Sequence, residues 1–448
     1  MDASSTNPST RGRRAALWTV LLAALIALPL GCGSVEKLGT VHTAKTISYV
    51  PGVPNFDLEA IGERRENDSR VRLHLGIPPA SLVFLRDSAR FRATYELSAA
   101  LYEPESKQLV TDEAWQDTVW SDRDLSTVYE PLTRTRTLSA PPGEYLLRVV
   151  LADDERDKPA ERIQRVTIPA VQNEDTYVSG LRLEHADESG SFHTLARLHL
   201  PSELDSLRAI ATIQPSDPES RLEVEWSVVR YESDHTVADP PYWLTPPPGS
   251  LEYLGIDYGS TDTIATSRAV LEGLGARDSL TYLLPEMSEG MYRVVLRAAV
   301  RSGGAVTERI EQYRDVSVKN PHFPEVASQD ELIEALTYIA RDKEMKRIQA
   351  PDRAGKRKER FDSFWGEIAR NEAHAARLLE TYYERVQEAN LYFTTHKSGW
   401  KTDRGMVYVV MGPPVEIEHY VDREIWYYGY PTNDRRRVYV FERGATYD

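Results

Sequence analysis

Alternating hydrophobic and polar residues dominate the middle of the chain. Apolar side chains recur at every second position in residues 71–77, 91–101 and 145–151, and a last strand is expected over 163–168. A period of two places the apolar side chains on one face, so each segment is predicted to be a strand with one buried face. Because no helical pattern interrupts them, residues 70–170 are predicted to form an antiparallel β-sandwich of the immunoglobulin type.

The same theme returns in the next part of the chain. Residues 289–296 (EGMYRVVL) repeat the pattern of residues 143–150 (GEYLLRVV), and further strands are expected over 192–200 and 222–231. We interpret this as a degenerate repeat that predicts a second sandwich over residues 171–319.

A proline-rich loop makes the second unit longer than the first. It contains Pro240, Trp243 and Pro246, and Tyr253, Tyr258 and the polar residues 260–263 follow it. Aromatic rings among hydroxyl groups could stack on a sugar or a peptide. A long loop that packs its own rings is the simpler interpretation.

Helical periodicity begins after residue 324. Ser328 and Glu331 have the spacing of a capping box ahead of an apolar stripe over 332–339, and a longer helix is predicted over 361–393. Beyond it, residues 406–411, 424–428 and 438–441 are predicted to be strands. Residues 325–448 are therefore predicted to form an α+β domain, in which a helical hairpin packs on a small antiparallel sheet.

The N-terminal residues have the pattern of an export signal. Basic residues 11–14 precede an apolar run over 15–30, which is slightly short for a membrane span. The run ends in LPLGC (28–32), which resembles the bacterial lipobox, with Pro29 where that pattern usually has leucine. The resemblance implies that residues 1–32 are a signal peptide and that Cys32 becomes the lipidated first residue, inserted in a bilayer through its acyl chains. An uncleaved anchor, or cleavage elsewhere, is the alternative.

Residues 33–69 are polar and are predicted to be a tether between the bilayer and the folded units. Gly33 rather than aspartate after Cys32 resembles lipoproteins sent to the outer membrane. We therefore expect a lipid-anchored protein of the cell envelope, on the outer membrane and facing the periplasm or the cell surface.

Composition narrows the classes of ligand. The formal net charge is -15, which argues against the nucleic-acid backbone as a principal partner. Cys32 is the single cysteine, so the chain has no internal disulfide and no cysteine-based metal cage. We expect no cofactor and no metal.

The densest group of aromatic, glycine and polar residues lies near the C-terminus. The sequence GWKTDRG (399–405), followed by GPP (412–414), resembles the bacterial GWxTD domain family, and residues 364–365 and 424–428 fit the same family. The resemblance implies the family's common plan, an export signal followed by sandwich-like modules, and implies no reaction. The candidate binding residues are Gly399, Trp400, Thr402, Asp403, Arg404, Gly405, Gly412, Pro413, Pro414 and Trp426.

Two hypotheses about function arise from this motif. In the first, each residue is structural: Gly399 ends the helix in the left-handed conformation, Trp400 enters the helix–sheet seam, and Thr402 and Asp403 bind backbone N–H groups. The protein is then a non-enzymatic envelope lipoprotein whose motif loop docks on a protein partner.

The alternative is an envelope hydrolase or carbohydrate-active protein. Acid–base chemistry requires titratable groups that converge on one cleft. The candidates are Asp403, paired with His396 or His419, and Glu416 or Glu418 as a second acid. The group Asp403, Glu416, Glu418 and His419 could also hold a metal, but the spacing of these residues is not diagnostic of one.

Overall fold

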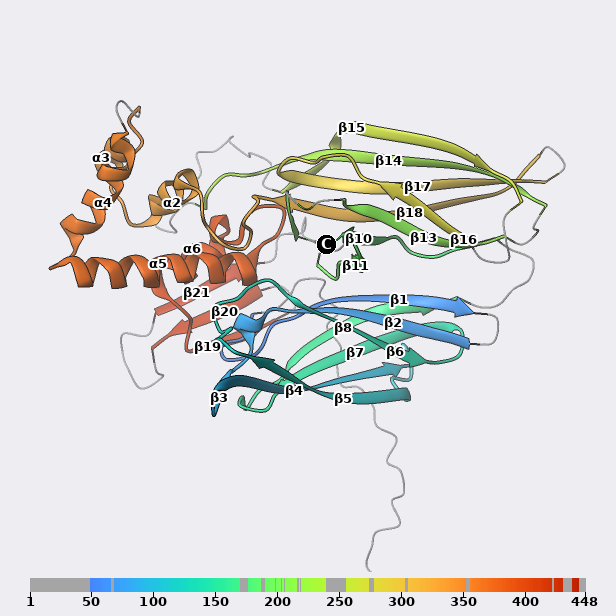
Figure 1. The fold of residues 1–448 in the computed structure, drawn as a ribbon, viewed down its shortest axis with the longest axis horizontal. Coiled ribbons are helices and arrows are strands. Elements are labelled where there is room, and N and C mark those ends of the chain that lie inside the picture. The colour runs from blue at the N-terminus through green and yellow to red at the C-terminus, as the bar shows by residue number, and fades with distance from the viewer. Residues whose placement is uncertain are drawn as a thin grey trace, which may run out of the picture.

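The computed structural model describes residues 49–65, 68–169, 176–186, 190–197, 199–202, 204, 206–215, 217, 219–238, 255–273, 278–302, 305–351, 355–420, 423–429 and 437–442. In these residues the protein is mostly β-sheet, with several antiparallel sheets and a C-terminal group of helices beside a small sheet (Figure 1). The predicted signal, Cys32 and the proline-rich loop over 239–254 lie outside the described residues.

The first β unit has two sheets around one core. One sheet has the order β1 (Asp57–Arg65), β2 (Asp68–Ile77), β6 (Leu132–Ser139). The other has the order β3 (Leu85–Asp87), β4 (Arg90–Tyr102), β7 (Gly143–Asp153), β8 (Ala160–Ile168), and β5 (Leu109–Ser121) also pairs with β4. Leu73 and Leu75 from the first sheet meet Leu97 and Leu147 from the second, all fully buried. The four strands predicted here by alternation are confirmed.

The tether expected over residues 33–69 is wrong at its C-terminal end. Residues 57–65 form β1, which pairs with β2 along its whole length, from Asp57 opposite Gly76 to Arg65 opposite Asp68. Leu58 and Ala60 pack against the core, so even this charged stretch has an apolar face. The folded part of the chain therefore begins before residue 70.

The second β unit also has two sheets. One has the order β11 (Phe192–Thr194), β10 (Arg182–Ala186), β13 (Arg208–Gln214), β16 (Asp278–Leu283), and β9 (Tyr177–Val178) pairs with β13. The other has the order β12 (His199–Pro201), β18 (Ala305–Lys319), β17 (Gly290–Ser302), β14 (Arg221–Ser233), β15 (Ile256–Leu271). Trp226, Tyr292 and Leu296 lie in their shared core.

The strand expected over 192–200 is two strands in different sheets. β11 pairs with β10, whereas β12 pairs in parallel with β18. Buried Leu195 lies in the segment of chain that connects β11 to β12. Alternation alone does not reveal where a chain crosses from one sheet to the other.

The two repeated segments adopt the same local structure. They lie in β7 and β17, where Tyr145 donates a hydrogen bond to the carbonyl of Pro141 and Tyr292 donates one to that of Ser288, each at 2.8 Å. Each tyrosine thereby binds the backbone four residues earlier, so the repeat includes a contact as well as a pattern.

Helices α2 (Gln329–Ala335), α3 (Asp342–Ile348), α4 (Lys356–Ile368), α5 (Glu372–Phe393) and α6 (Asp403–Met411) form the C-terminal unit with strands β19 (Glu416–His419), β20 (Arg423–Tyr428) and β21 (Arg437–Glu442). The capping box at Ser328 is confirmed. The single helix predicted over 361–393 is wrong, because Asn371 caps a new helix by accepting a hydrogen bond from the N–H of His374.

The strand predicted over residues 406–411 is also wrong. These residues lie in α6, where Met406, Val407, Tyr408 and Val409 are all buried. A short apolar run is compatible with a buried strand and with a buried helix. Here Thr402 caps the N-terminus of α6, which favours the helix.

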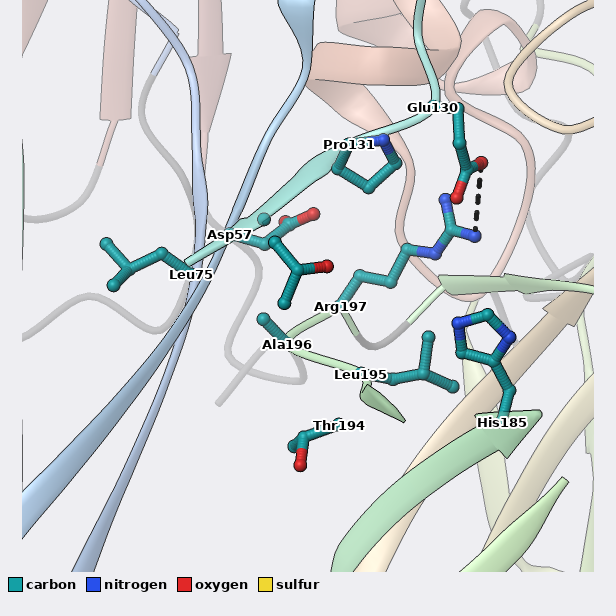
Figure 2. A pocket seen from close by; sticks show the side chains of 11 residues that line it. Asp57, Leu75, Glu130, Pro131, His185, Thr194, Leu195, Ala196 and Arg197 are labelled. Atoms are coloured by element: carbon teal, nitrogen blue, oxygen red, sulfur yellow. Dashed lines mark ion pairs between the residues drawn. The ribbon is translucent and has the colours of Figure 1, made fainter. Parts of the chain in front are cut away.

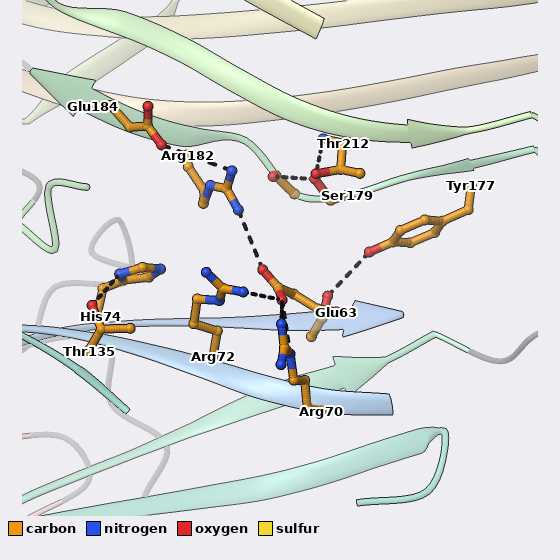
Figure 3. Close-up of polar contacts among 12 residues, drawn as sticks. Glu63, Arg70, Arg72, His74, Thr135, Tyr177, Ser179, Arg182, Glu184 and Thr212 are labelled. Carbon is orange, nitrogen blue, oxygen red and sulfur yellow. Dashed lines mark hydrogen bonds and ion pairs between the residues drawn. The ribbon is translucent and has the colours of Figure 1, made fainter. Parts of the chain in front are cut away.

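The two β units meet through charged groups. Glu63 of β1 lies among Arg70 and Arg72 of β2, at 3.2 and 2.9 Å, and Arg182 of β10, at 3.5 Å (Figure 3). Burial alone would raise the pKa of Glu63, but Arg72 and Arg70 outweigh it, and the pKa is lowered. Arg314 of β18 pairs with Glu59 of β1 in the same interface.

Tyr49 connects the N-terminal end of the described chain to the C-terminal unit. Its ring is buried in the core of the C-terminal unit, 4.6 Å from the ring of Tyr392 and within 5.5 Å of those of Phe393 and Tyr408. Residues just before the first β unit are thus built into the last unit of the chain.

Candidate functional site: the GWxTD junction

The two glycines of the motif permit backbone to touch backbone. A Cβ atom on Gly399 would lie 1.9 Å from the carbonyl oxygen of Ala389 in α5, and one on Gly405 would lie 1.9 Å from the carbonyl oxygen of Gly399. Gly399 begins the 3-10 turn Gly399–Lys401 and does not have a positive φ, so the expectation of a left-handed helix end is wrong. Close approach of two backbones, rather than an unusual conformation, requires glycine here.

Thr402 caps α6. Its hydroxyl donates to the carbonyl of Gly399 at 2.7 Å and accepts from the N–H of Gly405 at 3.1 Å. Asp403 follows as the exposed first residue of the helix, where a negative charge interacts favourably with the helix dipole. The pair Thr402–Asp403 is therefore a helix start.

Trp400 is buried between the helices. Its ring packs edge-on against Tyr338, whose hydroxyl donates to the Trp400 carbonyl at 2.8 Å. The side-chain oxygen of Asn390 faces the Trp400 N–H at 3.4 Å, and its amide donates to the carbonyl of Pro324 at 3.0 Å. These contacts fix the turn on α5.

The remaining motif residues bind α6 to the sheet. Arg404 pairs with buried Glu424 at 3.2 Å, and the same carboxylate faces the indole N–H of Trp426 at 3.4 Å. Gly412 ends α6 with φ 80°, and its carbonyl accepts from Tyr428 at 2.8 Å. Pro414 is buried, while Pro413 is exposed.

The segment just before the motif joins the C-terminal unit to the second β unit. Lys397 pairs with Asp234 at 2.7 Å, the N–H of Ala238 donates to the carbonyl of Lys401 at 2.9 Å, and buried Lys319 donates to the carbonyl of His396 at 2.8 Å. Burial, with repulsion from Lys401, lowers the pKa of Lys319 to about 7. The motif thus lies where helices, sheet and second unit meet.

The residues proposed for acid–base chemistry have other surroundings. Glu418 accepts hydrogen bonds from Tyr420 and Tyr427, at 2.8 and 3.0 Å, and Glu416 lies opposite Tyr427 in the sheet. His396 lies near Lys319, and burial followed by Lys397 and Lys319 lowers its pKa to about 4. The backbone of His419 pairs with Glu424, and its side chain lies outside the described part of the chain. The pairing of Asp403 with a histidine stays a prediction.

The described residues also bear on metal sites and membrane spans. In the described residues, no three His, Cys, Asp or Glu side chains are placed to hold one metal ion. Within the same residues, no helix is both long and apolar enough to cross a membrane.

A small cavity lies between the two β units (Figure 2). It has a volume of about 20 Å³, which is room for roughly one water molecule. Arg197 and Glu130, 3.6 Å apart, form part of its wall beside His185. Its size fits a buried water in an ionic interface, not a substrate.

Sequence reasoning missed an exposed apolar surface on the C-terminal sheet. Val438 and Val440 of β21 are 47% and 53% exposed, and they pair with Tyr427 and Ile425 of β20. On the other side of the same strands, Trp426 and Phe441 enter the core. The signal was visible in β21, because a strand that is apolar at both alternating positions is not a strand with one plainly solvated face.

Comparison with known proteins supports the assignment of the motif. Residues 306–447 match the family described as the GWxTD domain. No curated protein matches the chain.

Two solved structures share very weak similarity with the chain. The crystal structure of red sea bream transglutaminase is 9% identical, with a TM-score of 0.17, over 59% of this chain and 31% of that one. The fibronectin(III)-like modules of Clostridium thermocellum CbhA are 11% identical, with a TM-score of 0.16, over 61% of this chain and 99% of that one. The chain spans less than a third of the transglutaminase, and neither TM-score carries an argument about the fold.

The family match extends from the end of the second β unit through the helices and the small sheet, and it includes the junction built by Gly399, Trp400, Thr402 and Gly405. The chain is therefore a GWxTD domain-containing protein.

Proposed function

We propose that this protein is a lipid-anchored protein-interaction module of the cell envelope, and that the exposed face of its C-terminal sheet contacts the partner. The observation that carries the proposal is that the motif residues and the exposed residues of the C-terminal unit are different sets. The motif residues Gly399, Trp400 and Thr402 are used in internal contacts, whereas Val438 and Val440 are exposed side by side on β21. The motif loop first considered as the docking element is a structural junction in this proposal.

We define the valine face as Ile425, Tyr427, Val438 and Val440. Its centre is apolar, and its border carries Glu416, Glu418 and Glu442 beside Arg423. Three carboxylates against one guanidinium leave an excess of negative charge at this border. An exposed apolar patch with a polar rim is typical of a surface for protein contact. We infer a protein partner with an apolar patch bordered by basic residues.

We further infer that the two β units are immunoglobulin-like sandwich domains. In each, two sheets enclose one apolar core, and in each a tyrosine near the start of a strand binds the backbone four residues earlier. A tyrosine of this kind is one of the hallmarks of immunoglobulin-like sandwiches.

The position of Tyr49 limits how far the C-terminal unit can lie from the bilayer. If Cys32 is the lipidated residue, 49 − 32 = 17 residues separate the anchor from Tyr49, and they span at most about 60 Å when fully extended. Because Tyr49 is buried in the C-terminal unit, that unit is the one held near the membrane. We propose the outer membrane as the site of anchorage.

Changing Cys32 to alanine is expected to release the protein from the membrane. Acyl chains contribute about 0.8 kcal/mol per buried CH₂, and without the thiol they cannot be attached. The measurement is membrane fractionation of host cells together with metabolic labelling by a palmitate analogue. Ser34→Ala, two residues further on, is the matched control. Continued membrane association of Cys32→Ala without label would contradict lipid anchoring.

The double substitution Val438→Glu and Val440→Glu is expected to abolish partner binding and leave the fold intact. Both side chains are exposed, so the change adds charge to the apolar centre of the contact without altering the core. The measurement is cross-linking in intact cells from a photoreactive residue at position 442, with mass spectrometry of the adduct. The control is Val110→Glu, an exposed valine on the first β unit. The proposal fails if the valine-face variant retains the cross-link and the in vivo phenotype of the parent protein.

A further inference from the structure

We propose a second site, on the second β unit: the outer face of strands β15, β14, β17 and β18 binds a neutral oligosaccharide. A groove of about 430 Å³ runs over this face, within the usual range for a small-molecule site. We call it the threonine groove, after Thr261, Thr263 and Thr266, which β15 contributes to its wall. β15 is the outermost strand of the upper sheet in Figure 1. The site is independent of the valine face.

The register of the four strands explains the groove. One row across the sheet is Thr266, Ser227, Val295 and Tyr313, and the next is Thr263, Val229, Arg293 and Asp315. Short side chains therefore occupy the middle of the first row, where Ser227 and Val295 are buried at the floor, whereas the second row carries the long side chain of Arg293. The long side chains of Arg293 and Arg297 rise two residues before and after Val295 on β17, which leaves a trough over Ser227 and Val295.

A series of ion pairs forms one side of the threonine groove, which we call its first bank. Glu225 lies 2.5 Å from Arg268 and 3.7 Å from Arg297, and Arg297 lies 2.7 Å from Glu311. Arg293, at the other bank, is held by both oxygens of Asp315, at 2.6 and 2.9 Å. Three arginines thus face three carboxylates, and the groove has no net charge. An ionic ligand would have to compete with pairs already made, whereas the hydroxyl groups of a neutral one can bind their free edges.

Tyrosine rings gather at the second bank. Tyr313, Tyr231 and Tyr258 surround the Arg293 guanidinium, with centroids 4.2, 5.6 and 5.8 Å from its carbon. Tyr258 and Tyr313 are 52% and 57% exposed, and the rings of Tyr231 and Tyr258 meet edge to face at 5.1 Å. Exposed rings beside hydroxyl groups offer an apolar surface together with a polar edge. The pyranose ring has matching faces, with C–H groups on its surfaces and hydroxyls at its rim.

The combination distinguishes a saccharide from the alternatives. A purely apolar ligand would leave Thr261, Thr263 and Thr266 without use, and an anionic polymer would need an uncompensated cationic surface. A neutral oligosaccharide can stack on the tyrosines and bond to the threonine row and the ion-paired bank at once.

The test is isothermal titration calorimetry of the full chain with maltohexaose, cellohexaose and hexa-N-acetylchitohexaose. We expect saturable binding of at least one of these neutral sugars. Thr266→Trp, at an exposed position, should fill the groove and abolish binding. Tyr258→Ala should weaken binding roughly tenfold, since it removes a stacking ring. Trp120→Ala is the matched control, because Trp120 is an exposed ring beside Arg90 on the first β unit, and it should leave binding unchanged.

Near-UV circular dichroism of each variant establishes that the fold is retained. The proposal is overturned if none of the three sugars binds, or if one binds equally well to Thr266→Trp. It is also overturned if heparin binds in their place and is released by about 0.5 M salt, because that behaviour indicates an ionic site. None of these outcomes bears on the valine face, whose variants lie in another unit.

Discussion

Gly399→Ala is expected to prevent the C-terminal unit from folding. The added methyl group would lie 1.9 Å from the carbonyl oxygen of Ala389 and 2.7 Å from its carbonyl carbon. Neither atom belongs to a flexible side chain, so the turn and α5 must separate by more than 1 Å, roughly, to restore van der Waals contact. Trp400 would then lose its place beside Tyr338. We expect a loss of more than about 4 kcal/mol in the free energy of unfolding, which is exceptional for one substitution.

The matched control is Gly366→Ala in α4. A Cβ atom there meets nothing within 4 Å, and alanine is favoured over glycine in a helix by roughly 0.5–1 kcal/mol. Urea unfolding followed by tryptophan fluorescence, with limited proteolysis of the C-terminal unit, compares the two variants. If Gly399→Ala unfolds at the same urea concentration as Gly366→Ala, the close packing of the turn on α5 is not the reason for glycine.

Acidification from about pH 6.5 toward 4 is expected to weaken the joint between the second β unit and the C-terminal unit. Burial, followed by Lys397 and Lys319, lowers the pKa of His396 to about 4. Burial, followed by Lys319 and Arg197, lowers that of His199 to about 3. Both side chains are therefore neutral in the folded protein at a pH where an unfolded chain would already bind a proton.

The sign of the effect follows from proton counting. Between these pKa values and 6.5 the unfolded state binds more protons, so stability falls as the pH falls. Each histidine contributes up to about 1.4 kcal/mol per pH unit over that window. Lys319, Lys397 and Arg197 lie around the pair and oppose a new positive charge, whereas Asp234 partly offsets one on His396.

His396→Gln should reduce this dependence, because glutamine keeps a polar side chain that does not titrate. Hydrogen exchange of the backbone amides around Lys319 and Lys397 reports opening of the joint between the second β unit and the C-terminal unit. It is measured at several values between about pH 7 and pH 4. Exposed His322→Gln is the control. A pH dependence that His396→Gln leaves unaltered would assign acid sensitivity to other groups, such as the Glu63 cluster between the β units.

Alternation and capping residues were sufficient to predict much of this fold. Strands β2, β4, β7 and β8 lie where a period of two placed them, and α2 begins at the capping box of Ser328. These signals are local, since each depends on a few neighbouring residues and one buried face. The hidden features depend on distant residues: β1 becomes a strand through pairing with β2, and α6 becomes a helix in the seam against α5.

The candidate site was predictable only in part. The motif GWxTD indicates a specific structure, but its glycines are explained by carbonyl groups that no local pattern identifies. The threonine groove is harder still, because its rows contain one residue from each of four strands. Tyr258 and the polar residues after it could be noted from the sequence as candidates for sugar binding. That Arg293 and Tyr313 lie beside Tyr258 could be seen only from the pairing of the strands in the sheet.

The burial of Tyr49 has a consequence for the order of events during synthesis. A ribosome makes Tyr49 long before the residues that cover it, such as Tyr408 and Trp426. The two β units can complete their own cores as they emerge, but the C-terminal unit cannot complete its core until Tyr408 and Trp426 have been made. Until then Tyr49 lacks its contacts with the rings of Tyr408 and Trp426. The final step of folding then joins the beginning of the described chain to its end, and a truncated chain would leave that tyrosine exposed.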